Sequence, residues 1–383
     1  MNTTCSNSQP STTEGTLRVI ISGGGTGGHI FPAVSIANAV KALRPDAEIL
    51  FVGAEGRMEM QRVPAAGYEI KGLPIRGLYR PLWKPANISV AIDYLRSKWL
   101  AKKIIREFRP QVAVGVGGYA SSATLGAAYD MHIPCLVQEQ NSYAGLTNKR
   151  LADKAQVFCV AYEGMERFFP KDKIMLTGNP VRQNLLESKV TRQEALAAFG
   201  FKADQKTVLI VGGSLGARTL NESVLQHLKE IAGSGIQFIW QTGKYYSEQI
   251  ARELDAKGRP ANLFVTDFIS DMGAAYRAAD LVVGRAGAGS ISEFCLLGKP
   301  VILVPSPNVA EDHQTKNAMA LVDRDAALYV KDSEAVAKLI RLAVDTVRDE
   351  PLLASLHSHI LEMALPHSAE TIAREVIRLA GQP

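Results

Sequence analysis

The sequence predicts an α/β protein made of two Rossmann-like domains that face each other across a cleft. Two glycine-rich turns support this prediction, one at residues 23–29 and one at residues 212–218. Each turn follows an apolar, strand-like run and precedes a segment in which apolar residues recur with helical spacing. A strand, a glycine turn and a helix N-terminus together suit a phosphate group, so one such unit in each half predicts a reaction between the domains.

The length and composition agree with a two-domain enzyme of a reducing compartment. A chain of 383 residues exceeds one typical hydrophobic core, and 46% hydrophobic with 21% charged residues is typical of soluble α/β enzymes. The four cysteines lie far apart and form no CxxC pair, which argues against a disulfide framework and a structural zinc site. No apolar run approaches the about 18 residues that cross a bilayer. We therefore expect a cytoplasmic protein.

The first domain is expected over residues 17–178, after a disordered tail at residues 1–16. The tail is polar and lacks both the basic start and the apolar core of a signal peptide. Strand candidates alternate with helical segments, which is the pattern of a parallel sheet with right-handed crossovers. These candidates lie at residues 17–21, 48–52, 112–116, 133–138 and 156–160. A second glycine turn, at residues 117–118, follows the third of them.

The second domain is expected over residues 179–365, after a compact Gly-Asn-Pro turn at residues 178–182 that indicates a hinge. Its strand candidates lie at residues 207–211, 237–241, 263–265, 281–283 and 301–304. A further glycine turn at residues 284–290 repeats the arrangement of the first half. A last helix near residues 369–380, within the C-terminal segment 366–383, is expected to pack back on the first domain.

A basic segment with interleaved aromatic residues lies between residues 71 and 109. It contains ten basic and two acidic side chains, a net charge of +8, whereas the whole chain carries +5. Basic residues mixed with apolar ones suit anionic lipid headgroups, and the candidate contacts are Leu78, Tyr79, Leu82 and Trp83. A solvated helix face with ordinary core aromatics is the alternative. Nucleic acid is disfavoured as a partner, because no nucleic-acid motif accompanies the patch.

His29, directly after the first glycine turn, is the candidate catalytic residue. A helix N-terminus disfavours the protonated imidazole, and a neutral imidazole in a cleft can accept a proton from an attacking hydroxyl. A histidine that only caps the turn or packs on it is the alternative interpretation. The turn itself formally fits GxGxxG, but the acid nearest to the end of the second strand, Glu55, comes late for a nicotinamide site.

Three further polar positions suit a nucleotide ligand. Glu293 lies at the start of a helix, where a carboxylate could bind a vicinal diol such as ribose or only stabilise the helix. Arg182, at the hinge, could contact a diphosphate or be an ordinary surface arginine. Gln314 follows a proline turn at a strand end, where substrate-reading side chains often lie.

Two catalytic motifs are missing from the sequence. It has no HExxH zinc motif and no P-loop lysine. We therefore expect chemistry that requires neither a metal ion nor a cofactor.

Six blocks of the sequence, taken in order, resemble the signature blocks of the MurG family of bacterial glycosyltransferases. The resemblance runs from about residue 17 to the end of the chain, and the blocks lie at residues 25–33, 117–119, 139–148, 178–182, 212–217 and 312–314. Each block alone is weak evidence for the family, whereas six blocks in the same order are highly specific for it. Two departures occur: no histidine precedes Glu139, and Ala286 stands where serine is common. The first departure leaves His29 as the better base candidate.

The resemblance implies a GT-B fold and a defined reaction. The protein would transfer N-acetylglucosamine (GlcNAc) from UDP-GlcNAc to undecaprenyl-diphosphate-MurNAc-pentapeptide (lipid I), giving lipid II and UDP in peptidoglycan synthesis. The transfer would invert the anomeric carbon and require no metal or cofactor. An acceptor carried on a lipid implies a protein that is peripheral on the inner face of the cell membrane.

The resemblance also assigns the candidate site residues, with His29 as the base. The acceptor diphosphate would be held by Gly24, Gly25, Gly117, Gly118 and Tyr119. UDP-GlcNAc would be bound by Thr26, Gly27, Gly28, Asn141, Arg182, Ser214, Ile269, Ala288, Gly289, Ser290, Ile291, Ser292, Glu293 and Gln314. In this set Arg182 and Ser214 would meet the phosphates and the backbone at Ile269 the uracil. Glu293 would hold the ribose, and Gln314 would contact the GlcNAc hydroxyls.

Two other functions remain open from the sequence. A UDP-GlcNAc 2-epimerase uses the same kind of two-domain scaffold but needs no lipid-facing patch. A non-catalytic binder of nucleotide sugars would need no base, so its functions would survive the substitution His29→Ala.

Overall fold

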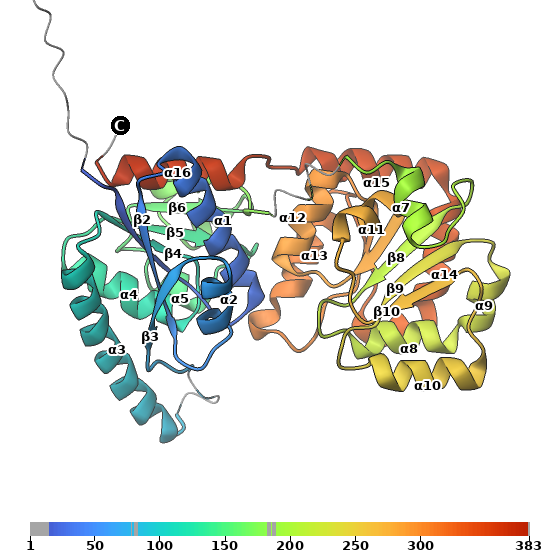
Figure 1. Cartoon of the computed structure of the whole chain (residues 1–383), viewed down its shortest axis with the longest axis horizontal. Helices are drawn as coiled ribbons and strands as arrows, with labels where there is room; N and C mark the ends of the chain where they lie inside the picture. Colours follow the sequence, from blue (N-terminus) through green and yellow to red (C-terminus); the bar gives the residue numbers. More distant parts are fainter. Residues whose placement is uncertain (1–14, 78, 80–82, 182–184, 186–188, 382–383) are drawn as a thin grey trace, which may run out of the picture.

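The computed structural model describes residues 15–77, 79, 83–181, 185 and 189–381. Within these residues the chain forms two α/β lobes that lie side by side, each built on its own parallel sheet (Figure 1). The predicted α/β class with two Rossmann-like domains is therefore confirmed. The domain boundaries expected at residues 178 and 365 stay predictions. The predicted site residues Leu78, Leu82 and Arg182 lie outside the described residues.

The first lobe contains a seven-stranded parallel sheet with the order β3-β2-β1-β4-β5-β6-β7. Its strands are β1 (Arg18–Ser22), β2 (Glu48–Ala54), β3 (Glu69–Leu73), β4 (Val112–Gly115), β5 (Cys135–Glu139), β6 (Val157–Val160) and β7 (Ile174–Leu176). The five strands expected from the sequence are among them. The other two, β3 and β7, were not expected. Both of these are edge strands with partly exposed side chains, so they lack the continuous apolar run of a buried parallel strand.

The second lobe repeats this plan with six parallel strands in the order β10-β9-β8-β11-β12-β13. They are β8 (Thr207–Val211), β9 (Gln237–Gln241), β10 (Leu263–Thr266), β11 (Leu281–Gly284), β12 (Val301–Leu303) and β13 (Leu328–Tyr329). In both sheets the strand order reverses beside the first strand, between β1 and β4 and between β8 and β11. Ligands of such sheets bind at the carboxyl ends of the strands at this switch point.

Helices cover both faces of each sheet. In the first lobe they are α1 (Gly27–Leu43), α2 (Glu59–Ala65), α3 (Ala86–Phe108), α4 (Tyr119–Asp130) and α5 (Leu146–Lys149). In the second lobe they are α7 (Arg192–Ala198), α8 (Arg218–Gln226), α9 (Leu228–Gly233), α10 (Ser247–Lys257), α11 (Met272–Ala278), α12 (Ala288–Leu297), α13 (His313–Val322), α14 (Asp332–Arg348) and α15 (Glu350–Glu362).

The C-terminal helix returns to the first lobe. α16 (Ser368–Leu379) lies against α1, as its position across the first lobe in Figure 1 shows. Its Ile372 and Val376 are buried in the same apolar cluster as Ile36 and Val40 of α1. The chain therefore passes between the lobes twice, once after β7 and once before α16.

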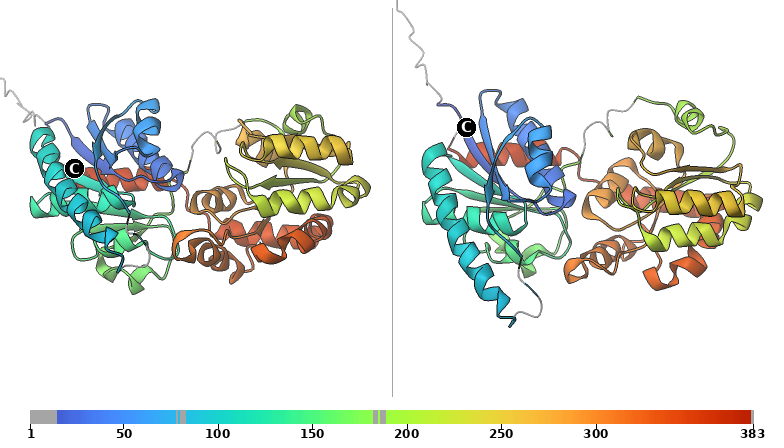
Figure 2. Two further views of the ribbon diagram at one scale, coloured as in Figure 1. Left: turned by 90° about the horizontal axis from the view of Figure 1, so that it is seen from below. Right: turned by 60° about the horizontal axis from the view of Figure 1, so that its bottom comes forward.

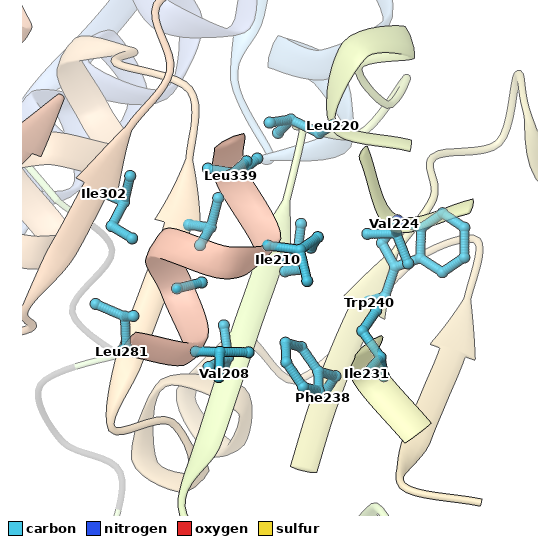
Figure 3. Close-up of a cluster of buried hydrophobic side chains, with 14 of the residues drawn as sticks. Val208, Ile210, Leu220, Val224, Ile231, Phe238, Trp240, Leu281, Ile302 and Leu339 are labelled. Carbon is cyan, nitrogen blue, oxygen red and sulfur yellow. The ribbon is translucent and has the colours of Figure 1, made fainter. Parts of the chain in front are cut away.

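Alternate residues of each central strand are buried on opposite faces of its sheet. In β8, Val208 and Ile210 pack with Trp240 on one face (Figure 3), whereas Leu209 belongs to the cluster on the other face. The indole N–H of Trp240 donates to Asn221 Oδ1 at 3.0 Å, so its polar atom is satisfied inside the core. Burial on both faces explains why these strands are continuous apolar runs in the sequence.

Candidate functional site

The two glycine turns of the first lobe pack against each other at the carboxyl ends of the neighbouring strands β1 and β4. The Gly24 N–H donates to the Gly117 carbonyl at 3.3 Å. Gly118 has φ of +88°, and a Cβ placed on it would lie 2.6 Å from the Gly24 carbonyl oxygen. Only glycine therefore permits this approach of one backbone to the other.

His29 lies where these two turns meet. Its Nδ1 is 2.8 Å from the Gly24 carbonyl oxygen. A carbonyl can only accept, so Nδ1 carries a hydrogen, and in the neutral form of the ring the lone pair is therefore on Nε2. A Cβ placed on Gly117 would be 2.8 Å from Nε2, so the basic nitrogen lies against the second turn. The ring is half-buried, and its Nε2 edge is oriented toward the turns.

Glu59, at the start of α2, accepts a hydrogen bond from the first turn, and it was not predicted from the sequence. Its carboxylate is 1% exposed. Oε2 accepts the Gly25 N–H at 2.9 Å, and Oε1 accepts the Ala54 N–H at 3.0 Å. The sequence gives little signal, because Glu59 stands among the charged and polar residues that follow β2 rather than in an apolar run.

The contacts of the first turn separate its residues into two groups. The N–H groups of Gly24 and Gly25 donate to protein acceptors. The contact of these two glycines with the acceptor diphosphate stays a prediction. The first N–H groups of a helix have no partner within the helix, and α1 begins at Gly27 without a side-chain cap from Thr26. Any anion at this turn would therefore meet Thr26, Gly27 and Gly28.

The loop after β5 is built around a second buried carboxylate, Glu139. It accepts the N–H groups of Asn141 and Gly145, each at 3.0 Å, and the Asn148 amide at 2.8 Å. The loop then reaches the second lobe through Asn317 of α13. Asn317 Nδ2 donates to Asn141 Oδ1 at 3.1 Å, and Asn317 Oδ1 accepts the Ser142 N–H at 2.9 Å.

A second polar contact joins the lobes at Asn179. Its Nδ2 donates to the Gln140 carbonyl at 3.0 Å and to Ser292 Oγ of α12 at 3.0 Å. Ser292 and Asn141, both expected from the sequence to bind the donor, therefore lie at the junction of the two lobes. Asn179 and Asn317 were not predicted to bridge the lobes, because a contact between distant segments leaves no local pattern in the sequence.

The glycine turn of the second lobe lies at the carboxyl end of β8, beside the start of α12. Gly216 has φ of +85°, and a Cβ placed on it would overlap the Thr242 carbonyl oxygen. Ser214 is exposed on this turn. α12 begins at Ala288, and Ala288, Gly289, Ser290 and Ile291 form its first turn, which has no side-chain cap. Because β8 pairs with β11, the two N–H-rich segments lie next to each other.

The remaining donor-site candidates of the second lobe already have protein partners. Glu293 Oε2 accepts the Tyr276 hydroxyl at 2.9 Å. The Ile269 N–H donates to Gln241 Oε1 at 2.9 Å, so a base at this position would meet the Ile269 carbonyl unless Gln241 moves. Gln314 Oε1 accepts the Ser306 N–H at 2.9 Å. The amide N–H groups of Gln314 take no part in this contact.

Within the basic segment, α3 carries a stripe of exposed apolar side chains. Trp83 is 84% exposed, and Tyr79 is also exposed. Ile88, Ile92, Leu95 and Trp99 follow on α3 with exposures between 60% and 68%, at the spacing of one helix face. Figure 2 shows α3 on the side of the first lobe that is remote from the second lobe. Sequence reasoning missed Ile88, Ile92 and Leu95, because an apolar helical stripe usually faces the core.

None of the described helices combines the length and the apolar character that a membrane span needs. Within residues 15–381, apart from the undescribed positions, no three His, Cys, Asp or Glu side chains are grouped so as to hold a metal ion.

Comparisons with known proteins agree with this geometry. The glycosyltransferase family 28 N-terminal domain matches residues 19–159, and the glycosyltransferase family 28 C-terminal domain matches residues 207–371. The chain is 64% identical over 368 residues to the UDP-N-acetylglucosamine–N-acetylmuramyl-(pentapeptide) pyrophosphoryl-undecaprenol N-acetylglucosamine transferase of Bacteroides fragilis, with 96% of each chain covered.

Solved structures support the same relationship. MurG of Acinetobacter baumannii has a TM-score of 0.76 at 28% identity, over 94% of this chain and 99% of that one. A putative UDP-N-acetylglucosamine 2-epimerase of Listeria monocytogenes has a TM-score of 0.69 at 13% identity, over 94% and 96% of the two chains, and shares only the fold. The chain therefore belongs to the MurG family of glycosyltransferases, within glycosyltransferase family 28.

Proposed function

We propose that this protein transfers GlcNAc from UDP-GlcNAc to undecaprenyl-diphosphate-MurNAc-pentapeptide, with inversion, and so produces lipid II and UDP. The observation that carries the proposal is the 64% identity, over nearly the whole of both chains, to a relative whose name states this activity. The geometry supports it by providing a candidate base on one lobe and a diphosphate-binding arrangement on the other.

The base is His29, acting from Nε2. The acceptor hydroxyl gives its proton to Nε2 while its oxygen attacks the anomeric carbon from the face opposite the leaving UDP. The new C–O bond forms as the bond to the UDP oxygen breaks, and the configuration inverts. In the neutral ring, the Nδ1 hydrogen bond to the Gly24 carbonyl places the lone pair on Nε2. General-base catalysis of this kind contributes about 10²–10⁴-fold to the rate.

The leaving diphosphate belongs to the second lobe. The first turn of α12 presents N–H groups and the positive end of the helix dipole, and the exposed Ser214 adds a hydroxyl from the neighbouring turn. Arg182 is proposed to contact the same phosphates. Glu293, held by Tyr276, would bind the ribose. Asn141 and Gln314 would contact the sugar, and the loop that carries Asn141 contacts both lobes through Asn317.

The acceptor side of the first lobe is proposed to rest on the inner face of the cell membrane. The stripe of Ile88, Ile92, Leu95 and Trp99 would lie on the lipid surface together with Tyr79 and Trp83. Exposed basic side chains on the same helix, Arg96, Lys103 and Arg106, would meet anionic headgroups. Leu78 and Leu82 belong to the same proposed surface.

Vesicle binding tests this surface. Wild-type protein should co-sediment with vesicles that contain anionic phospholipid, and the double variant Ile92→Ser with Leu95→Ser should bind at least tenfold more weakly. The matched control is Leu361→Ser, which removes an exposed leucine from the second lobe and should bind like wild type. Equal binding of all three proteins would place the membrane contact elsewhere.

Product analysis tests the reaction itself. Purified protein is incubated with UDP-GlcNAc in EDTA, with and without a short-chain lipid acceptor, and the products are identified by mass spectrometry. The proposal expects a disaccharide lipid and UDP, formed only when the acceptor is present. UDP and N-acetylmannosamine formed without lipid would instead establish an epimerase, for which the structure offers only a shared fold.

A further inference from the structure

The buried carboxylate of Glu59 and the imidazole of His29 bind the two ends of one peptide group. The peptide that joins Gly24 to Gly25 directs its N–H to Glu59 Oε2 at 2.9 Å. Its carbonyl oxygen accepts the hydrogen of His29 Nδ1 at 2.8 Å. In a trans peptide these two groups point in opposite directions, so the carboxylate, the peptide and the imidazole form one continuous chain of hydrogen bonds.

We propose that Glu59 is a positioning residue that acts on His29 through the Gly24–Gly25 peptide, an inference that rests on the proposed function of His29 as the base. Glu59 polarises this peptide and fixes its orientation, because hydrogen bonds in a chain strengthen one another and a charged acceptor binds an N–H more strongly than a neutral one. The oriented carbonyl in turn keeps the hydrogen of His29 on Nδ1. The lone pair therefore stays on Nε2, which faces the second turn.

The surroundings of Glu59 are shaped for a carboxylate. A Cβ placed on Gly24 would overlap Glu59 Oε1, and one placed on Gly53 would be 2.6 Å from Glu59 Cγ, so two glycines make room for this side chain. One oxygen accepts an N–H group from the loop after β1, and the other accepts the N–H group of Ala54, the last residue of β2. A glutamine would keep one acceptor but turn its amide N–H group toward the other backbone N–H. The neutral isostere therefore cannot replace both contacts.

The arrangement also stabilises the charge that the reaction creates. When the acceptor hydroxyl gives its proton to Nε2, the imidazole becomes a cation whose Nδ1–H still donates to the Gly24 carbonyl. A peptide already polarised by Glu59 presents a more negative oxygen to that cation. Glu59 thus supports the base without touching the substrate.

The test compares Glu59→Gln with Glu55→Gln, a matched control that changes an exposed glutamate in the same loop. Proteins labelled with ¹⁵N in the histidine rings report which ring nitrogen carries the hydrogen, and the loss of a signal in His29→Asn identifies His29. In wild type we expect hydrogen on Nδ1. In Glu59→Gln we expect a mixture of both tautomers, and in Glu55→Gln the wild-type spectrum.

Kinetics provide the second measurement. In Glu59→Gln we expect kcat with the short-chain acceptor to fall roughly 10- to 100-fold, less than the about 10⁴-fold loss seen when the carboxylate bonded directly to a catalytic histidine is replaced. The Kd for UDP should stay within twofold of wild type, because the second lobe binds it. A role in stability alone would lower kcat and UDP binding together and leave the tautomer unchanged.

Each outcome decides the proposal. Hydrogen on Nε2 in wild type would overturn it, and so would a Glu59→Gln variant with unchanged tautomer and turnover. If that variant does not fold, Glu59→Asp replaces it, because a side chain one methylene shorter cannot reach both N–H groups. Unchanged spectra and kcat in Glu59→Asp would then overturn the proposal. Failure of wild type to use any lipid acceptor would refute the proposed function separately, because the NMR measurement needs no turnover.

Discussion

The glycine turns that follow β1 and β8 have the same local design, but the protein holds them in opposite ways. The first turn is held through an N–H: Glu59, a buried anion, accepts the Gly25 N–H. The second is held through a carbonyl: Gln241, a neutral amide, donates from Nε2 to the Gly213 carbonyl at 3.0 Å. Each turn also packs against a second backbone, the first turn at residues 117–118 and the second turn at residues 242–244.

This difference explains how one motif can serve two roles. The Glu59 carboxylate accepts one N–H group of the first turn and adds negative charge there. This arrangement can orient a base, but it disfavours the binding of a nucleotide diphosphate. At the second turn the Gly216 N–H donates to the Gly213 carbonyl. The neutral Gln241 uses no further N–H group of this turn and adds no charge that would oppose an anion. Chemistry is therefore expected at the first turn and donor binding at the second.

Among substitutions of the glycines, the largest effect is expected from Gly118→Ala, which breaks the packing between the turns of the first lobe. The new Cβ would lie 2.6 Å from the Gly24 carbonyl oxygen that binds His29. We expect kcat to fall about 100-fold, because displacements near 1 Å at a catalytic group have this cost. Gly67→Ala is the matched control, since Gly67 has φ of +87° but nothing within 4 Å. If both variants lose the same activity, backbone strain rather than the turn contact is responsible.

A smaller effect is expected from Gly216→Ala in the turn of the second lobe. The new Cβ would overlap the Thr242 carbonyl oxygen, so the turn must shift from its position. We expect KM for UDP-GlcNAc to rise roughly 30-fold, because hydrogen bonds to charged groups contribute about 1.5–3 kcal/mol. Gly258→Ala, at a φ of +85° with open space around it, provides the control. A fall in kcat with unchanged KM would contradict the separation of roles.

Glu293→Ala tests the donor side without changing a turn. The carboxylate lies in α12 and is held by Tyr276, so its removal should weaken the ribose contact and leave the base intact. We expect KM for UDP-GlcNAc to rise roughly tenfold, measured by initial rates with saturating acceptor. Glu248→Ala, an exposed glutamate on α10, should behave as wild type. Donor kinetics that stay unchanged would refute the ribose assignment.

The smallest effect concerns the partly buried side chain of Lys299, which lacks the paired contacts of Glu59. Lys299 donates to the Ala279 carbonyl at 2.9 Å, and burial lowers its pKa to about 8, although the nearby Asp280 partly opposes this shift. The unfolded chain keeps this proton up to its ordinary pKa near 10.5, so from pH 8 to 10.5 the unfolded state binds more protons than the folded state. This group therefore makes the free energy of unfolding rise with pH.

The pH dependence of Lys299→Met measures this effect. The free energy of unfolding of wild type and variant is measured by chemical unfolding at pH 7.5 and at pH 9.5. Between these two pH values, the free energy of unfolding of wild type should increase relative to that of the variant, by no more than a few kcal/mol. The difference between the two proteins removes the contribution of groups that both share, such as the buried cysteines. A wild-type protein that loses stability relative to the variant over this range would contradict the direction of the pKa shift.

Sequence reasoning located the parts that depend on local pattern and missed those that depend on distant contacts. Buried parallel strands such as β1 and β8 are continuous apolar runs, so they were predicted, whereas β13, with two residues, leaves no such run. His29 was found because it directly follows a glycine turn. Glu59 and Asn317 were missed because their partners, Gly25 and Asn141, lie 34 and 176 residues away.

The exposed stripe on α3 shows a second limit of sequence reasoning. Ile88, Ile92, Leu95 and Trp99 have the spacing of a core-facing helix, and only the structure shows that this face is directed to solvent. Aromatic and basic composition predicted the surface, but the aliphatic residues that extend it could not be separated from core residues before the orientation of the helix was known.

The separation of roles between the two turns is tested most directly by measuring two variants in parallel. The Kd for UDP by calorimetry and the single-turnover rate at saturating UDP-GlcNAc are determined for His29→Ala and Gln241→Ala. We expect His29→Ala to lose about 10³-fold in rate with its Kd within twofold of wild type. Gln241→Ala should bind UDP about tenfold more weakly and keep its rate within threefold. Loss of rate and loss of UDP affinity in the same variant, or in both, would contradict the account.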